Sequence, residues 1–155
     1  MFVIACKIYH SLFREDIQNE EMISIIHNTF YNEEKGLYKL STNGEDYSQL
    51  GNSFAILVGL GNELIAEALV NDISLIPVTL SMNTFYYDAL LSVNSKFREF
   101  VLKDIKSKYG KMLAQGATTF WETEKGWQDF DGAGSLCHGW SAIPVYYLVK
   151  LKTIV

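Results

Sequence analysis

The chain has 155 residues, of which 48% are hydrophobic and 14% aromatic, with a net charge of −5 and a pI of about 5.1. This length and apolar content predict one domain, residues 1–155, with a sizeable core, and they exclude an intrinsically disordered chain. The thirteen basic residues are scattered along the sequence, which excludes the electrostatic footprint typical of a nucleic-acid-binding protein.

Residues 1–16 read MFVIACKIYHSLFRED, with apolar residues at three- and four-residue spacing. This spacing predicts a helix rather than a signal peptide, because a basic leader and a cleavage site after a long apolar run are both missing. No run approaches the roughly 18 apolar residues of a membrane helix. We therefore expect a cytoplasmic protein. The uncapped start of this helix is unusual for a complete domain, so we also expect a truncated N-terminus.

A second helix is predicted from a cap at Asp16, through an apolar stripe over residues 22–31, to a stop at Gly36. The sequence GLYKLST, residues 36–42, is expected to be short and extended. A further extended run is predicted over TTFW, residues 118–121.

The remaining apolar periodicity predicts helices only. Gly110 is expected to end the longest of them, and Pro144 is tolerated in the first turn of the last. With about seven helices joined by loops of unequal length, the sequence predicts an all-α fold of antiparallel helical hairpins. The five further helices are expected at 47–60, 63–71, 82–92, 95–109 and 141–151.

The longest loop holds the most specialised composition. Residues 116–140 read GATTFWETEKGWQDFDGAGSLCHGW, with three tryptophans, two phenylalanines and five glycines around several carboxylates. Long loops often carry function. Acids with exposed aromatics fit a carbohydrate better than a nucleotide, which calls for a glycine-rich phosphate loop or basic residues.

Each acid and indole of this loop has a plain structural interpretation beside the functional one. Glu122 is either an exposed glutamate or a carboxylate in a pocket next to an indole. Asp129 and Asp131 are either solvated turn acids or a clamp on the hydroxyls of a ligand. Trp127 and Trp140 either belong to the core or stack on a sugar ring.

The histidine and the cysteines predict no metal site or cofactor. His138 has no second histidine or cysteine at metal-ligand spacing, so it is either a structural residue or part of a binding site. The adjacent Cys137 is badly placed to form a nucleophile–base pair with it. Two cysteines, Cys6 and Cys137, define neither a disulfide framework nor a metal site, and we expect two buried free thiols in a reducing compartment.

The motifs GATTFWE and SLCHGWSAIPVYYL together resemble the C-terminal part of bacterial α-L-rhamnosidases, glycoside hydrolase family 78. Upstream, YSQLGNSFAILVGL and LSMNTFYYDALL also look like that part of the family. The resemblance runs from about Gly36 to the C-terminus. It implies the fold of these six-hairpin glycosidases, an (α/α)6 barrel, of which this chain would be the C-terminal portion, an incomplete toroid.

The resemblance also implies functions for particular residues. Glu122 matches the general base of an inverting hydrolysis of α-L-rhamnosides, and His138 matches a residue of the sugar pocket. Trp121 and Trp140 would line the same pocket. From the residues alone, Trp127 and Asp131 are further candidates for contact with a carbohydrate, which the resemblance implies is of the rhamnoside type.

The chain departs from the family in one decisive way. The resemblance implies that the general acid and the sugar-gripping acidic cluster come from the first half of the barrel, which this sequence lacks. Inverting hydrolysis needs two carboxyl groups about 6.5–9.5 Å apart. We therefore expect little activity from the isolated chain. A non-catalytic carbohydrate-binding or structural remnant remains the alternative, and a scaffold whose aromatics are simply core is a third possibility.

An incomplete barrel implies an uncovered apolar wall. Large apolar patches drive association. We therefore expect either a homodimer in which two copies close each other's open edge, or a partner chain that completes the barrel.

Overall fold

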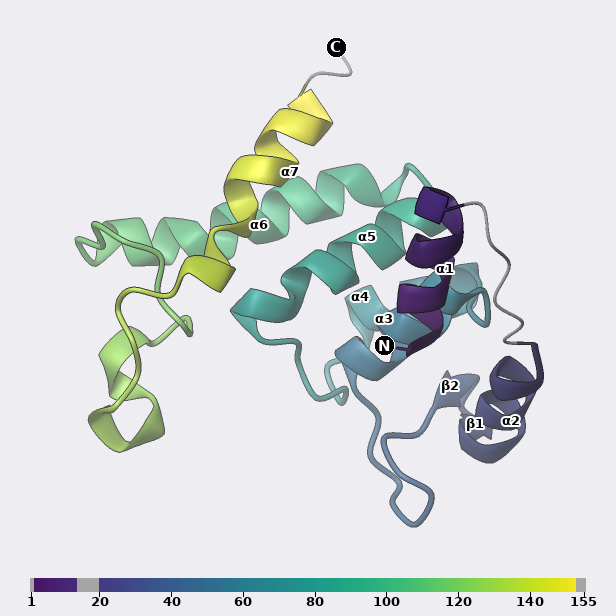
Figure 1. Ribbon diagram of the computed structural model, residues 1–155. Helices are drawn as coiled ribbons and strands as arrows, with labels where there is room; N and C mark the ends of the chain where they lie inside the picture. The colour runs from purple at the N-terminus through teal and green to yellow at the C-terminus, as the bar shows by residue number, and fades with distance from the viewer. Residues whose placement is uncertain (1, 14–19, 153–155) are drawn as a thin grey trace.

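The computed structural model describes residues 2–13 and 20–152, and within them it is almost wholly helical (Figure 1). This confirms the predicted all-α class. A two-stranded antiparallel hairpin pairs Tyr31 with Tyr38. The described elements are α1 (Phe2–Phe13), α2 (Glu20–Phe30), β1 (Tyr31–Asn32), β2 (Leu37–Tyr38), α3 (Gln49–Val58), α4 (Glu63–Asn71), α5 (Asn83–Val93), α6 (Phe97–Ala114) and α7 (Ile143–Lys152), with 3-10 turns η1 (Leu80–Met82), η2 (Gly126–Gln128), η3 (Phe130–Gly132) and η4 (Gly139–Ser141).

Local sequence sets the bounds of the central helices. The Ser48 side chain accepts a hydrogen bond from the Gly51 N–H at 3.0 Å and begins α3. Gly59, in the left-handed region at φ 94°, ends this helix. Asn62 then caps α4 by accepting from the Ile65 N–H at 3.1 Å. These capping residues thus account for both ends of α3 and for the start of α4, which has the predicted bounds 63–71.

Two glycines behave differently from the prediction. Gly36 does not stop a helix, because α2 ends at Phe30 and Gly36, at φ 66°, lies in the turn of the hairpin. Gly110 does not end α6, which continues to Ala114. A helical glycine costs only about 1 kcal/mol, and burial of Tyr109 and Met112 on either side offsets that cost. The predicted cap Asp16 lies outside the described residues.

The core forms where α3 packs on α5, the most extensive contact between any two described elements. The helices α4 and α6 flank this pair, and α7 packs on α6 (Figure 1). The most deeply buried apolar side chains come from α4, α5, α6 and α7: Ile65, Ala66, Leu69, Tyr86, Tyr87, Ala89, Leu90, Val101 and Tyr147.

Buried tyrosine hydroxyls connect these helices to one another. Tyr86 on α5 donates to the Leu69 carbonyl of α4 at 3.0 Å. Tyr87 donates to the Asp104 carboxylate of α6 at 2.7 Å. Tyr147 of α7 reaches back to the Thr84 carbonyl of α5 at 2.9 Å. Each ring fills core volume while its hydroxyl satisfies a polar group on a neighbouring element.

A fully buried asparagine holds the hairpin on α3. The Asn52 side chain accepts from the Tyr38 N–H at 2.8 Å and donates to the Tyr38 carbonyl at 3.0 Å. Its amide also donates to the Ser48 carbonyl at 3.1 Å. The Tyr38 hydroxyl then donates to the Leu60 carbonyl at 3.0 Å and lies 2.8 Å from the His27 ring of α2. The Asn52 side chain therefore pairs with the backbone N–H and carbonyl of Tyr38 in β2, which a further strand would otherwise pair.

We expect Asn52→Ala to lower the free energy of unfolding by about 2–4 kcal/mol, because it leaves buried backbone groups of Tyr38 unsatisfied. Urea denaturation followed by circular dichroism measures this change. The exposed Asn71, which bonds within its own helix, supplies the control: Asn71→Ala should cost no more than about 0.5 kcal/mol. Equal losses from the two variants would contradict the structural importance of Asn52.

Alkaline pH should unfold the protein through its buried phenols. Burial raises the pKa of Tyr86, Tyr87, Tyr109 and Tyr147 above the ordinary value of 10.0. Above pH 10 the unfolded chain therefore releases protons that the folded chain retains, and stability falls as the pH rises further. We expect part of the phenolate absorbance to appear only together with loss of the helical signal. Ionisation of all nine tyrosines with the helices intact would contradict this.

Candidate functional site

The ring-rich segment leaves the end of α6, turns outside the helical body and returns to α7 (Figure 1). Its base is a short two-stranded ribbon. The Glu122 N–H donates to the Ser135 carbonyl at 2.9 Å, and the His138 N–H donates to the Phe120 carbonyl at 2.7 Å. The predicted extended run at 118–121 thus finds a partner, although too few bonds form for a regular strand. This ribbon positions the candidate residues.

Glu122 is half-buried at the base of the ribbon. Its carboxylate accepts a hydrogen bond from the Ser135 N–H at 3.2 Å, so backbone and side chain of Glu122 both engage Ser135. This contact occupies Oε2, and no residue in the described ranges donates to Oε1. The carboxylate is therefore held in place with one oxygen available to a water or a ligand.

Trp121 is buried, and its ring packs beneath the loop. Gly126, at φ 61°, lies directly against it: a Cβ at this glycine would approach the Trp121 ring to 2.7 Å and Leu136 to 2.9 Å. The indole therefore acts as the small core of the loop. Contact between Trp121 and a sugar stays a prediction, and the packing favours a supporting role for this side chain.

The tip of the segment carries Trp127, Asp129 and Asp131. Trp127 is 58% exposed in η2, and Asp131 is exposed with φ 56° in η3. Asp129 lies 3.5 Å from Lys125, and its carbonyl accepts from the Gly134 N–H at 3.0 Å. The surroundings of Asp129 are those of a turn acid. The exposed indole of Trp127 and the carboxylate of Asp131 remain accessible to a ligand.

His138, in the second half of the ribbon, lines a groove between α6 and α7 together with Cys137. The groove has a volume of about 930 Å³, within the range of ligand pockets. Trp140, in η4, follows His138 in the chain and is 79% exposed. Most of the remaining lining is apolar, notably Leu102, Ile105, Tyr109, Leu113, Val145 and Leu148.

Sequence reasoning missed this groove, although its signal was present. Leu102, Ile105, Tyr109 and Leu113 recur at three- and four-residue spacing along α6 and form one face of that helix. Such a face is expected to pack against another element. In the structure α7 covers only part of it, and the rest stays open.

The structure brings the predicted residues together only in part. Glu122 and His138 both belong to the ribbon, but only His138 lines the groove. Within residues 2–13 and 20–152, no three His, Cys, Asp or Glu side chains gather as metal ligands would. In the same residues, no helix has the length and apolar character needed to cross a bilayer.

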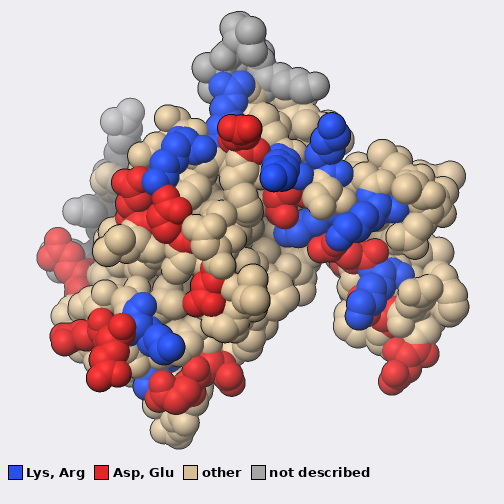
Figure 2. All heavy atoms as spheres, turned by 180° about the vertical axis from the view of Figure 1, so that it is seen from behind, with Lys and Arg blue, Asp and Glu red and all other residues tan. Residues whose placement is uncertain are grey.

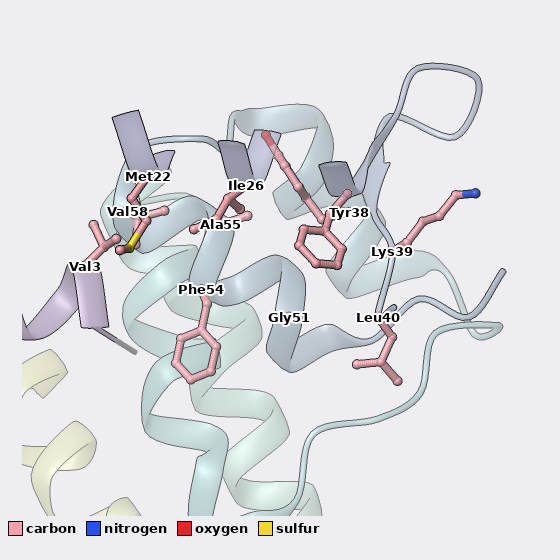
Figure 3. Close-up of a pocket in the computed structure, with 11 residues that line it drawn as sticks. Val3, Met22, Ile26, Tyr38, Lys39, Leu40, Gly51, Phe54, Ala55 and Val58 are labelled. Atoms are coloured by element: carbon pink, nitrogen blue, oxygen red, sulfur yellow. The ribbon is translucent and has the colours of Figure 1, made fainter. Parts of the chain in front are cut away.

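A second hollow, of about 330 Å³, lies between α1, α2, the hairpin and α3 (Figure 3). Eleven residues line it, and Lys39 is the one charged residue among them. The amino group of Lys39 points away from the other labelled side chains (Figure 3). Its lining holds no acid, histidine or thiol. Of the two lining residues that could do acid–base chemistry, Lys39 is paired with Glu45 and the Tyr38 hydroxyl donates to the Leu60 carbonyl, so neither is free for that chemistry.

The importance of the Trp121 packing can be tested at Gly126. We expect Gly126→Ala to lower the free energy of unfolding by about 1–3 kcal/mol, because the new methyl overlaps the indole and the backbone is left-handed. Thermal unfolding and tryptophan emission measure the effect. Gly132→Ala is the matched control, since its φ is 90° but its Cβ would meet open space. Equal effects from the two would show that the indole contact is unimportant.

No protein-family model matches the sequence, and no curated protein matches it either. Solved structures do match. A GH78 family rhamnosidase of Bacillus sp. GL1 superposes with a TM-score of 0.71 at 27% identity over 83% of this chain. A rhamnosidase from Klebsiella oxytoca with rhamnose bound superposes with a TM-score of 0.69 at 20% identity over 86% of this chain.

These matches define the fold and its extent. The chain has the helical fold of part of a GH78-like rhamnosidase domain, and the likeness supports a relationship to glycoside hydrolases. This chain covers 15% of the length of the Bacillus enzyme and 28% of the length of the Klebsiella enzyme.

Proposed function

We propose that this chain is the C-terminal part of an α-L-rhamnosidase-like glycoside hydrolase domain and that Glu122 is its general base. The observation that carries the proposal is the structural match to the Bacillus rhamnosidase at 27% identity over most of this chain. The geometry of Glu122 supports it, because a half-buried carboxylate fixed through one oxygen is suited to hold a water with the other.

The proposed reaction is a single displacement. Glu122 takes a proton from a water, whose oxygen bonds to the anomeric carbon on the face opposite the glycosidic oxygen. The bond from the anomeric carbon to that oxygen breaks, and the leaving oxygen takes a proton from a second carboxyl group. The configuration at the anomeric carbon inverts. Ser135, through its backbone N–H, keeps the base oriented during this step.

The second carboxyl group is the missing component. The nearest acids in sequence are already paired: Glu124 lies 3.3 Å from Lys111, and Asp129 lies 3.5 Å from Lys125. Each of these carboxylates is therefore engaged by a lysine and not free to protonate a leaving oxygen. We therefore place the general acid outside these 155 residues. Without it, hydrolysis should be slower by roughly 10²–10⁴-fold.

The sugar contacts are assigned to the side chains that remain accessible. His138 contributes a polar group at the end of the groove, and exposed Trp140 offers an aromatic face to the sugar. Trp127 and Asp131, at the tip of the loop, form a second accessible pair. Trp121 supports the loop from beneath and positions the adjacent Glu122.

Hydrolysis of an aryl α-L-rhamnoside tests the role of Glu122. Glu122→Gln should lower the rate by at least about 10²-fold, because the amide does not accept the proton from water. Glu124→Gln, two residues away with a half-exposed ion pair, is the matched control and should change the rate less than about threefold. Proton NMR should show β-L-rhamnose as the first product. A measurable rate of the unmodified chain that Glu122→Gln leaves unchanged would overturn the assignment.

A second candidate function is carbohydrate binding without hydrolysis. The exposed Trp127 and Trp140 and the single candidate carboxylate favour it. Here L-rhamnose would quench or shift the tryptophan emission, Trp140→Ala would weaken binding about tenfold, and no aryl rhamnoside would be hydrolysed.

A further inference from the structure

Two fully buried side chains, Asn83 and Ser141, carry polar atoms that no neighbouring group satisfies. Both residues are 0% exposed. The Nδ2 atom of Asn83 and the Oγ atom of Ser141 have no hydrogen-bond partner among the described residues. In native proteins the large majority of buried polar side-chain atoms bond to protein or to ordered water, so each exception calls for an explanation.

The two residues lie at a contact between two short turns. Asn83 begins α5 directly after η1, and Ser141 is the last residue of η4. Although η1 and η4 are far apart in the sequence, they pack against each other, and the start of α5 lies beside the turn that leads into α7 (Figure 1). The two unpartnered atoms therefore belong to one region of the fold.

Tyr109 of α6 connects the two residues. Its hydroxyl donates to the Ser141 carbonyl at 3.0 Å. Burial and the charges of Asp104 and Glu124 raise the pKa of this phenol, and the Asn83 side chain opposes the rise. A side chain that lowers the pKa of a phenol acts as a donor, so Asn83 Nδ2 faces the Tyr109 oxygen, in a geometry short of a hydrogen bond.

Lys108 fixes the orientation of the Asn83 amide. Its ammonium group lies 3.3 Å from Asn83 Oδ1 and 2.8 Å from a carboxylate oxygen of Asp104. An ammonium group only donates, so it holds the amide oxygen and leaves the NH₂ group on the opposite side. An exchange of the amide oxygen and nitrogen would bring two donors together. The atom that needs a partner is therefore the nitrogen, and it needs an acceptor.

The donors and acceptors of this cluster determine what it binds. Asn83 Nδ2 requires an acceptor, and the Tyr109 oxygen, which already donates to Ser141, has only acceptor capacity left. The Ser141 hydroxyl can donate or accept. A metal cation offers no acceptor to an NH₂ group. The ligand must therefore both accept and donate, and water is the smallest molecule that does so.

The charges around the cluster disfavour an anion. Asp104 and Glu124 are near enough to raise the pKa of Tyr109, so an anion there would meet negative charge. The Lys108 ammonium is already paired with Asp104. Figure 2 shows basic side chains interspersed with acidic ones on the rear face of the molecule, as such pairing requires. A neutral ligand fits these surroundings better than an ion.

We propose that one ordered water molecule is bound between Asn83, Tyr109 and Ser141, where it accepts from Asn83 Nδ2 and bonds to the two hydroxyl groups. Buried waters typically make about three hydrogen bonds, and this cluster offers three groups. The bridge ties α5 and α6 to η4, the turn that carries Trp140. Asn83 is thereby a positioning residue for that exposed indole. The inference is independent of the role of Glu122 and of sugar binding.

A double-mutant cycle tests whether one water couples the two residues. Ser141→Ala and Asn83→Leu each remove a partner of the water, and each should lower the melting temperature by about 2–6 °C. Removal of a truly unsatisfied group would instead leave it unchanged or raise it. Because the two atoms do not bond to each other, only a bridge couples them. The double variant should therefore lose at least about 2 °C less than the sum of the single losses.

Asn62→Ala supplies the control for this cycle. Asn62 caps α4, and the next residue, Glu63, lies 3.5 Å from Asn94 at the opposite end of α5 from Asn83. Loss of the cap should lower the melting temperature by a similar amount. Its combination with Ser141→Ala should be additive within about 1 °C, because no group is shared.

Fluorine NMR tests the effect on η4. Protein labelled with fluorotryptophan gives one signal for each of its three tryptophans, and Trp140→Phe and Trp127→Phe assign the two exposed ones. Asn83→Leu should shift or broaden the Trp140 signal and leave the Trp127 signal unchanged. Asn62→Ala should alter neither. An unchanged Trp140 signal in Asn83→Leu would overturn the positioning role.

A crystal structure of the full chain tests the water directly. We expect a water within hydrogen-bond distance of Asn83 Nδ2 and Ser141 Oγ, and its loss in the double variant. A structure in which these two atoms contact only protein would overturn the proposal. A higher melting temperature in Ser141→Ala, or additive losses in the double variant with helices intact by circular dichroism, would also overturn it.

Discussion

Phenolic hydroxyls aimed at neighbouring elements hold this helical body together. Tyr86 joins α5 to α4, Tyr87 joins α5 to α6, and Tyr147 joins α7 to α5. Tyr109 joins α6 to η4 through the Ser141 carbonyl at 3.0 Å. Because each hydroxyl has a defined acceptor, the bonds specify which helices are neighbours, which apolar contact alone does not.

The same contacts link the core to the candidate site. Tyr109 is at once a core residue, a lining residue of the groove and the donor that fixes η4, the turn that carries Trp140. The ribbon at 120–138 lies next along the chain and depends on the packing of Trp121. A site assembled on such supports is rigid at its base and open at its tip, where Trp127 and Asp131 are exposed. This arrangement suits the fixed base and the adaptable sugar contacts that we propose.

Helix type and order followed from apolar spacing, and capping residues such as Asn62 and Gly59 explain where helices begin and end. The wrongly predicted helix ends came from interpreting Gly36 and Gly110 as residues that end a helix. At Gly110 the burial of Tyr109 and Met112 outweighed local preference, and at Gly36 the residue served a hairpin turn instead. The sequence identified the loop that contains Glu122 and His138. It could not predict that Glu122 pairs with Ser135 and His138 with Phe120, because these backbone bonds join residues far apart in the sequence and no local pattern specifies them. For the same reason the groove became evident only once α7 was placed on α6.

Of the two thiols in the sequence, Cys6 is buried as expected, whereas the expectation of a buried Cys137 is wrong, because Cys137 is exposed at the edge of the groove. The chain therefore carries one natural attachment point for a maleimide dye or a nitroxide spin label, at the edge of the groove between α6 and α7. A probe bound there would report polarity and mobility at the groove without any engineered substitution. The protected thiol of Cys6 would meanwhile stay unmodified until α1 separates from the rest of the fold.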